Sequence, residues 1–124
     1  MNNPKDFYYT SSHEWVQFIS ETVVRIGITD YAQTQLGDLV YIEMPEEGDS
    51  ITAGQSFANV ESVKGVSDVI APVSGSIVSI NEALMDAPQM MNENAFEAWI
   101  IEVEGVMDKT GLLTAAEYNA ICIC

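Results

Sequence analysis

The sequence has few basic residues and no long hydrophobic run, and each shortage excludes a class of protein. Only four lysines and arginines stand against nineteen acidic residues in a chain of 124, which gives a net charge of −15. Such a surface repels nucleic acid and anionic membranes, so we expect neither as a partner. Hydrophobic residues make up 48% of the chain, but no stretch approaches the roughly 20 apolar residues of a membrane-spanning helix.

Cysteine is equally scarce, and the N-terminus lacks a targeting pattern. Cys122 and Cys124 stand at the C-terminus with one residue between them, which suits neither an ordinary disulfide nor a metal site. We expect two reduced thiols at the end of a helix. The first residues have neither the apolar segment of a signal peptide nor the bias of a transit peptide. We therefore expect a cytoplasmic protein, or a mitochondrial matrix protein if the chain is a processed eukaryotic one.

Short strands dominate what the sequence does contain. Residues 22–28 place Val24, Ile26 and Ile28 on one face at a period of two, which is typical of a half-buried strand. Turn residues rich in proline and glycine separate the strands, which we expect at EWVQFIS (14–20), TVVRIGI (22–28), LVYIEM (39–44), FANVES (57–62), VSDVIA (66–71), GSIVSI (75–80) and AWIIEVE (98–104). Many short strands in a chain of this length indicate a single domain over 1–124, built as a sandwich or barrel.

Helical patterns are few. Thr29 can cap a short helix over residues 30–37 that ends at Gly37, and Asn81 can cap a brief turn over 82–86. The best helix covers residues 110–123, with a broad apolar stripe and a capping box formed by Thr114 and Glu117. We expect it to pack on the outside of the β core.

Lys64 lies at the centre of an internal symmetry. The segments FANVES and VSDVIA flank it, and Gly54 and Gly75 lie at similar distances before and after it. Two strands joined by Val63, Lys64 and Gly65 predict a hairpin with Lys64 at its tip. A lysine in a turn is usually only a solvated charge, but the chain has just three lysines, Lys5, Lys64 and Lys109.

The segment VESVKGVSDVIAPVSGSIV resembles the lipoyl-attachment segment of lipoyl carriers. There the acceptor lysine sits at a hairpin tip, an acidic residue precedes it and a Pro-x-Ser-Gly turn follows. The stretches YYTSSHEWVQF, GITDYAQTQLGDLVYIEMPEEGD and INEALMDAP extend the likeness, and together they resemble the H protein of the glycine cleavage system over about 100 residues. The resemblance implies a mostly β barrel-sandwich hybrid of the lipoyl/biotinyl type, with small helices and a C-terminal helix.

The same resemblance implies a function. H proteins hold lipoate in amide linkage to a lysine, here Lys64, on an arm with a reach on the order of 10–15 Å. They take an aminomethyl group of glycine from the pyridoxal-phosphate-dependent glycine decarboxylase (P protein) to the aminomethyltransferase (T protein). Dihydrolipoyl dehydrogenase (L protein) then reoxidises the arm. We therefore expect a monomeric carrier without catalytic residues or metal, to which lipoyl-attaching enzymes add the arm.

Further site residues follow from the family pattern. Ser12, Glu14 and Asp68 stand where the family has its cleft residues, and we expect them to shelter the cationic loaded arm by charge-assisted hydrogen bonds. Glu61 and Gly75 are expected to contribute to recognition of the attachment hairpin. Any one of these acids, taken alone, could equally be an ordinary surface acid in so acidic a chain.

Other conspicuous residues carry weaker signals. His13, the sole histidine, has no recognisable nucleophile or metal partner and predicts a structural or hydrogen-bonding role. Trp15 and Trp99 are expected in the core. Three methionines fit gap-filling better than a contact surface, namely Met85, Met90 and Met91.

Three alternatives stay open at the level of sequence. A biotinyl domain would normally have methionines beside its lysine, where this chain has Val63 and Gly65. A lipoyl domain of a 2-oxoacid dehydrogenase would normally have aspartate before the lysine and no HEW segment. An H-like lipoyl relay or redox protein that serves other partners would have the same arm and hairpin.

Overall fold

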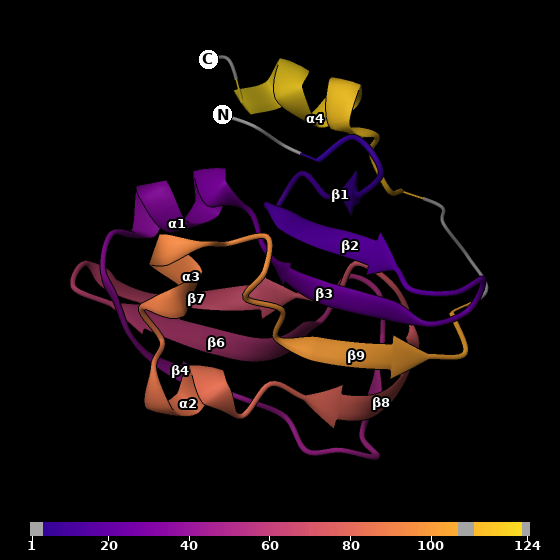
Figure 1. The fold of residues 1–124 in the computed structure, drawn as a ribbon, viewed down its shortest axis with the longest axis horizontal. Coiled ribbons are helices and arrows are strands. Elements are labelled where there is room, and N and C mark those ends of the chain that lie inside the picture. Colours follow the sequence, from indigo (N-terminus) through magenta and orange to yellow (C-terminus); the bar gives the residue numbers. More distant parts are fainter. Residues whose placement is uncertain (1–3, 107–110, 123–124) are drawn as a thin grey trace.

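The computed structural model describes residues 4–106 and 111–122, and two antiparallel sheets make up most of it. The larger sheet has six strands in the order β1-β2-β3-β9-β8-β5, and the smaller has three in the order β4-β6-β7 (Figure 1). The six are β1 Tyr8–Tyr9, β2 Glu14–Phe18, β3 Val24–Ile28, β9 Ile101–Glu104, β8 Gly75–Ile80 and β5 Ser50–Ile51. The three are β4 Leu39–Glu43, β6 Ser56–Ser62 and β7 Gly65–Ile70.

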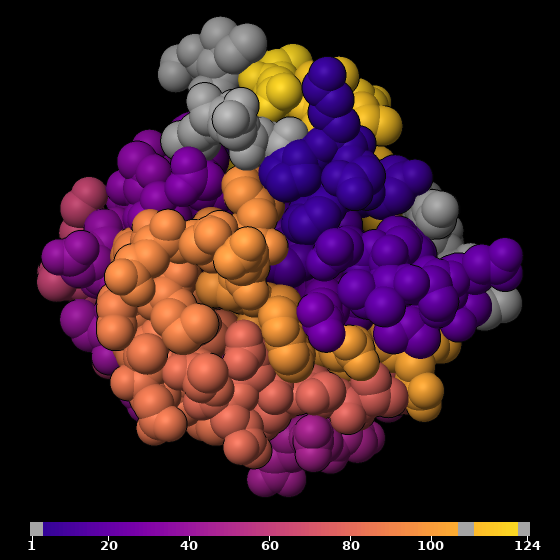
Figure 2. Space-filling model, viewed as in Figure 1, coloured from indigo at the N-terminus to yellow at the C-terminus, as the bar shows by residue number. Residues whose placement is uncertain are grey.

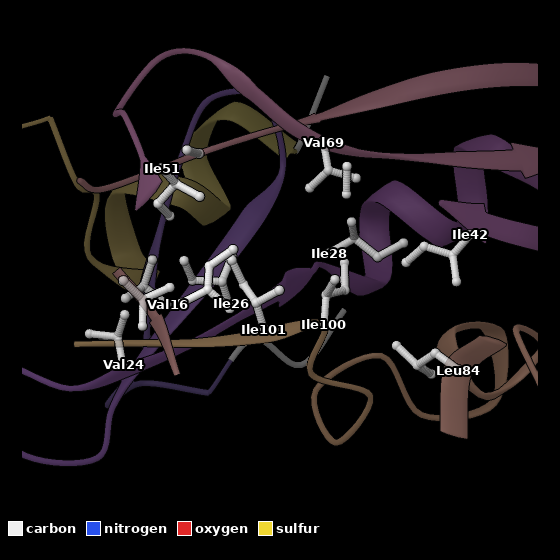
Figure 3. Packing of buried hydrophobic residues seen from close by; sticks show 14 of the residues in the cluster. Val16, Val24, Ile26, Ile28, Ile42, Ile51, Val69, Leu84, Ile100 and Ile101 are labelled. Carbon is white, nitrogen blue, oxygen red and sulfur yellow. The ribbon is translucent and has the colours of Figure 1, made fainter. Parts of the chain in front are cut away.

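The core lies between the two sheets. Val24, Ile26 and Ile28 of β3 are buried, as their alternation predicts. Ile42 and Val69 from the smaller sheet belong to the same cluster, and Figure 3 shows their side chains turned toward that of Ile28. The short strands β1 and β5 were not expected from the sequence. Each is only two residues long, too short to show an alternation.

The first helix, α1 Asp30–Leu36, agrees closely with the sequence. The Thr29 hydroxyl caps it by accepting the Ala32 backbone N–H at 3.1 Å, and Gly37 follows it with φ 78°. The turn near Asn81 becomes α2 Ala83–Asp86, but the cap expected from Asn81 is wrong. Its side chain instead donates to the Trp99 carbonyl at 2.9 Å. A further turn, α3 Met90–Glu93, was not predicted.

The C-terminal helix is present but shorter than expected. It is α4 Ala115–Cys122, while residues 110 and 123 of the predicted range lie outside the described part of the chain. The capping box is confirmed, with Thr114 and Glu117 exchanging hydrogen bonds of 3.0 and 3.3 Å. Leu113, just before it, pairs with Tyr9 of β1 through bonds of 2.7 and 2.8 Å, which delays the start of the helix. Cys124 also lies outside the described residues, so the expectation for the two thiols stays a prediction.

A second apolar cluster joins α4 to the N-terminal strands. It contains Phe7, Tyr9, Trp15, Ala115 and Tyr118, and the rings of Tyr9 and Tyr118 stack at 4.8 Å. Figure 2 shows the indigo N-terminal residues against the yellow helix at one end of the molecule. α4 therefore packs outside the main core, as predicted.

The tryptophans and methionines divide between core and surface. Trp15 is buried as expected, but Trp99 is only partly buried, with the Arg25 guanidinium 4.9 Å from its ring centroid. Met91 fills the core, Met90 packs against it and Met85 is exposed. Gap-filling is thus confirmed for Met91 and is wrong for Met85.

The architecture is the mostly β barrel-sandwich hybrid, with small helices and a C-terminal helix, that the sequence predicts. None of the helices in the described part of the chain is long and apolar enough to cross a membrane.

Candidate functional site

Lys64 stands at the tip of the β6–β7 hairpin, as predicted. The last cross-strand pair joins Ser62 to Gly65, so Val63 and Lys64 form the connecting loop. Gly65 has φ 144°, a region that favours glycine. The lysine side chain is exposed, and in Figure 1 the hairpin turns at the edge of the molecule on the side of α1. An enzyme can therefore approach Lys64 without opening the fold.

Contacts from the end of α1 hold this tip. The Val63 backbone N–H donates to the Asp38 carbonyl at 3.1 Å, and the Lys64 ammonium donates to the Gln35 carbonyl at 3.3 Å. A Cβ added at Gly37 would lie 3.5 Å from Lys64 Cε, an ordinary van der Waals distance, so the lysine stem passes directly beside Gly37. The tip is thus positioned mainly by backbone groups of a neighbouring loop.

Asn92 of α3 fixes that loop, and sequence reasoning missed it. Its Oδ1 accepts the Leu39 backbone N–H at 2.9 Å. Its Nδ2 donates to the Gly37 carbonyl and to Gln33 Oε1, each at 2.9 Å. The Asp38 carbonyl accepts the Val63 N–H. Asp38 therefore lies between Gly37 and Leu39, and the Asn92 side chain bonds both of these neighbours. No local pattern marks Asn92, because its partners lie more than fifty residues away in sequence.

Glu14 is a buried carboxylate at the start of β2, with only 2% of its surface exposed. Its Oε1 accepts hydrogen bonds from the hydroxyls of Thr10 at 2.7 Å and Ser12 at 2.6 Å. The backbone N–H of Ile70, at the end of β7, also donates to this carboxylate. Burial raises the pKa of Glu14 above its usual range, and the hydrogen bonds partly oppose that shift. Ser12 is exposed, so a ligand can reach this pair from the solvent side.

The structure brings Ser12 and Glu14 together, as predicted, but keeps Asp68 separate from their hydrogen bonds. Asp68 is exposed on β7, paired with Asn59 of β6. It precedes Ile70, the backbone donor to Glu14, by two residues. Asp68 therefore lies along the strand between Lys64 and the buried carboxylate.

His13 occupies the turn between Ser12 and Glu14 and has φ 72°, which is rare for a residue other than glycine. Such a conformation costs on the order of 1 kcal/mol and persists only where surrounding contacts hold it. The His13 Nδ1 lies 2.7 Å from the Tyr118 hydroxyl, and burial lowers the pKa of the ring. The hydrogen-bonding role expected for His13 is confirmed.

Glu61 and Gly75 occupy different kinds of position. Glu61 is exposed in β6 and pairs with Tyr41 on one side and Val66 on the other. A Cβ at Gly75 would lie 2.5 Å from the Glu104 carbonyl oxygen, so β8 and β9 can pack this closely only around glycine. Glu61 is available to a partner, while Gly75 has a clear packing role.

Several apolar side chains of the hairpin and of the adjoining strand β4 are exposed. Val63 and Val66 are 67% and 66% exposed, and Val40 and Tyr41 of β4 are also largely exposed. Neighbouring exposed apolar residues of this kind are typical of an interaction surface.

Comparison with known proteins agrees with this geometry. The family model described as Glycine cleavage H-protein matches residues 7–123. A glycine cleavage system H protein of Geobacillus kaustophilus is 50% identical over 124 residues, with 98% of this chain and 97% of the relative covered. The one of Lachnoclostridium phytofermentans is 47% identical over 115 residues, with 93% and 91% covered. The crystal structure of a glycine cleavage system H protein from Mycobacterium marinum superposes with a TM-score of 0.87 at 40% identity, over 96% of this chain and 98% of that one. The resemblance inferred from the sequence is thereby confirmed, and the chain belongs to the glycine cleavage H-protein family.

Proposed function

We propose that Lys64 is the attachment residue of this lipoyl carrier of the glycine cleavage system. The observation that carries the proposal is the position of Lys64, which is exposed at the tip of a tight hairpin and held in place by α1. A primary amine so placed can enter the active site of another enzyme while the sheets stay intact. The neighbouring exposed residues Val63 and Val66 offer that enzyme an apolar contact surface.

The residues present fit a lipoyl amide. The lysine stem lies against Gly37 without obstruction, and the Lys64 backbone N–H is fixed by the Ser62 hydroxyl at 3.1 Å. When attached, the dithiolane would supply the disulfide and dithiol chemistry that accepts an aminomethyl group derived from glycine. The chain itself would supply the position of the arm and protection from water.

We propose that Ser12, Glu14 and Asp68 give that protection. Asp68 lies four residues after Lys64, about 13 Å along an extended strand at about 3.3 Å per residue. An arm of the length expected reaches Asp68 before it reaches the Ser12–Glu14 pair. Both acids would attract the ammonium of the loaded arm, and the hydroxyl of Ser12 would orient Glu14 toward it.

Glu61 would assist recognition of the hairpin by the lipoyl-attaching enzymes, because it is exposed close to the tip. Gly75 would assist indirectly, because it has no side chain and so allows β8 to pack closely against β9.

The partners that follow from this role are glycine decarboxylase, aminomethyltransferase, dihydrolipoyl dehydrogenase and the lipoyl-attaching enzymes. We propose that the chain serves them as a single-domain monomeric carrier of the cytoplasm, without an enzymatic activity of its own. Its net charge of −15 favours partners with basic docking surfaces and makes association faster at low salt.

Intact-mass analysis after incubation with a lipoate–protein ligase, lipoate and ATP tests the attachment residue. The native chain should gain one lipoyl amide, and Lys64→Arg should gain none. Lys5→Arg is the matched control, because Lys5 is also exposed, and it should gain the same increment as the native chain. An increment retained in Lys64→Arg, or a biotin-sized increment with a biotin ligase instead, would overturn the proposal.

A further inference from the structure

The turn at residues 10–13, between β1 and β2, contains Ser12 and leads directly into Glu14, the first residue of β2. Two backbone bonds close it, from the Thr10 N–H to the Glu14 carbonyl at 3.0 Å and from the His13 N–H to the Thr10 carbonyl at 3.1 Å. His13 takes the left-handed conformation that this closure requires. The position of the Ser12–Glu14 pair therefore depends on what holds His13.

Aromatic residues from two other elements hold the His13 ring. Tyr31 of α1 lies with its ring centroid 4.5 Å away. The ring centroid of Tyr118 of α4 lies 5.6 Å from that of His13 in a T-shaped arrangement, and its hydroxyl lies 2.7 Å from His13 Nδ1. The two residues joined by this hydrogen bond are 105 positions apart, so the C-terminal helix reaches back to the turn.

The Tyr118 hydroxyl makes a second contact that extends to α1. It lies 2.6 Å from Thr29 Oγ1, and this oxygen caps α1 by accepting the Ala32 N–H. The other end of α1 supplies the carbonyl of Gln35 to the Lys64 ammonium. One hydroxyl thus joins the turn that carries Glu14 to the helix that contacts Lys64.

The hydrogen bonds that run from Ala32 through Thr29 and Tyr118 to His13 can all point the same way. Thr29, which accepts from Ala32, can donate to Tyr118, and Tyr118 can then donate to His13 Nδ1. Each hydroxyl has one proton, so this arrangement uses every proton and leaves the His13 ring neutral. Thr29 and Tyr118 are both fully buried, which makes a broken link in the chain costly.

We propose that Tyr118 is a positioning residue for the arm-sheltering site, whose hydroxyl fixes the 10–13 turn, and with it Ser12 and Glu14, against the N-terminal end of α1. The inference rests on the proposed sheltering role of Glu14. It gives the C-terminal helix a function in protecting the loaded arm from hydrolysis.

Tyr118→Phe tests the inference, with Tyr9→Phe as the matched control. Both tyrosines are fully buried and stack on each other, but the Tyr9 hydroxyl bonds the Pro4 carbonyl and does not touch the turn. The first readout uses the lipoylated carrier loaded by the decarboxylase, with ammonia release as the measure of hydrolysis. We expect Tyr118→Phe to hydrolyse roughly threefold to tenfold faster than the native chain, the range that the net contribution of about one hydrogen bond gives. Tyr9→Phe should hydrolyse at the native rate.

The second readout needs no arm. In the unmodified protein, the Glu14 carboxyl carbon is titrated by NMR. A loosened turn admits water, so the Glu14 pKa should fall toward its usual range in Tyr118→Phe and stay unchanged in Tyr9→Phe. Equal titration and equal hydrolysis in the two variants would overturn the inference.

Glu14→Gln separates this failure from failure of the proposed function. If Glu14→Gln hydrolyses at the native rate, Glu14 does not shelter the arm and both ideas are wrong. If Glu14→Gln is faster while Tyr118→Phe and Tyr9→Phe match the native chain, the shelter stands and only the role of Tyr118 is wrong.

Discussion

The attachment tip and the Glu14 site lie at opposite ends of β7 and are built in opposite ways. Lys64 is exposed and two backbone carbonyls hold it. The carbonyl of Gln35 in the last turn of α1 accepts from its ammonium, and the carbonyl of Asp38 in the α1–β4 loop accepts from the adjacent Val63. Glu14 is buried and is held by two side-chain hydroxyls and one backbone N–H. Backbone contacts position the tip while leaving the lysine side chain free to be modified. Side-chain contacts hold a charge that would otherwise be costly to bury.

The difference agrees with the roles that we propose for the two ends. An attachment residue has to enter the active sites of several enzymes, so its side chain must project from the surface of its own protein. A sheltering acid works only where water is scarce, because charge-assisted hydrogen bonds are stronger there. We therefore expect mutations at the Glu14 site to lower the free energy of unfolding. Mutations of Lys64 should prevent modification with little effect on that free energy.

The largest loss of stability should come from Thr10→Val. This change removes a donor to the buried Glu14 carboxylate and also the oxygen that accepts the Glu14 backbone N–H at 3.1 Å. Leaving a buried charged group short of a partner should lower the free energy of unfolding by about 2 to 3 kcal/mol. Urea unfolding followed by tryptophan fluorescence measures it.

Thr52→Val is the control for this comparison. Thr52 is exposed and lies outside both ends of β7, so its replacement should change the free energy of unfolding by less than about 0.5 kcal/mol. An equal loss in Thr10→Val and Thr52→Val would contradict the account of the buried site.

A smaller and more local loss is expected from Asn92→Ala. The change removes the bonds to Leu39 and Gly37 on either side of Asp38 and should cost about 1 to 2 kcal/mol. Amide hydrogen exchange should speed up at Val63, which depends on Asp38, more than at Val16 in the core. Unchanged exchange at Val63 would show that the tip does not depend on α3.

The pH dependence of stability should distinguish the two ends further. Burial raises the folded pKa of Glu14 above the ordinary value of 4.5, so the unfolded chain ionises at lower pH than the folded one. The folded state therefore loses stability as the pH rises from the unfolded pKa through the folded pKa. Glu14→Gln cannot ionise, and its stability relative to the native chain should increase as the pH rises above 4.5. Thr52→Val, which removes no ionisable group, should show no such change. A flat difference for Glu14→Gln would mean that the carboxyl is not buried in solution.

Sequence reasoning predicted the parts that depend on near neighbours. The hairpin at Lys64, the Thr29 cap and the alternation of β3 all follow from residues within a few positions of one another. The family pattern also identified Ser12 and Glu14, which the structure bonds together.

Contacts between distant segments could not be predicted in this way. The Asn92 side chain bonds residues more than fifty positions earlier, and the Tyr118 hydroxyl bonds His13 and Thr29. Local propensity says nothing about such pairs, because they form only after the sheets and helices have packed. Leu113 shows the same limit, since its pairing with Tyr9 overrides a helical pattern.

The smallest effect is expected at Lys64 itself. Its ammonium makes one exposed hydrogen bond of 3.3 Å to Gln35, and Lys64→Gln should change the free energy of unfolding by no more than about 0.5 kcal/mol. Glutamine is neutral, as the lysine side chain becomes when its amine forms an amide. A small effect therefore means that attachment does not disturb the hairpin, and that the backbone bond between Val63 and Asp38 suffices to hold it. A loss comparable to that of Thr10→Val, measured in the same urea titration, would show instead that the lysine charge is part of the structure. The division between a freely modifiable tip and a tightly held acid would then be wrong.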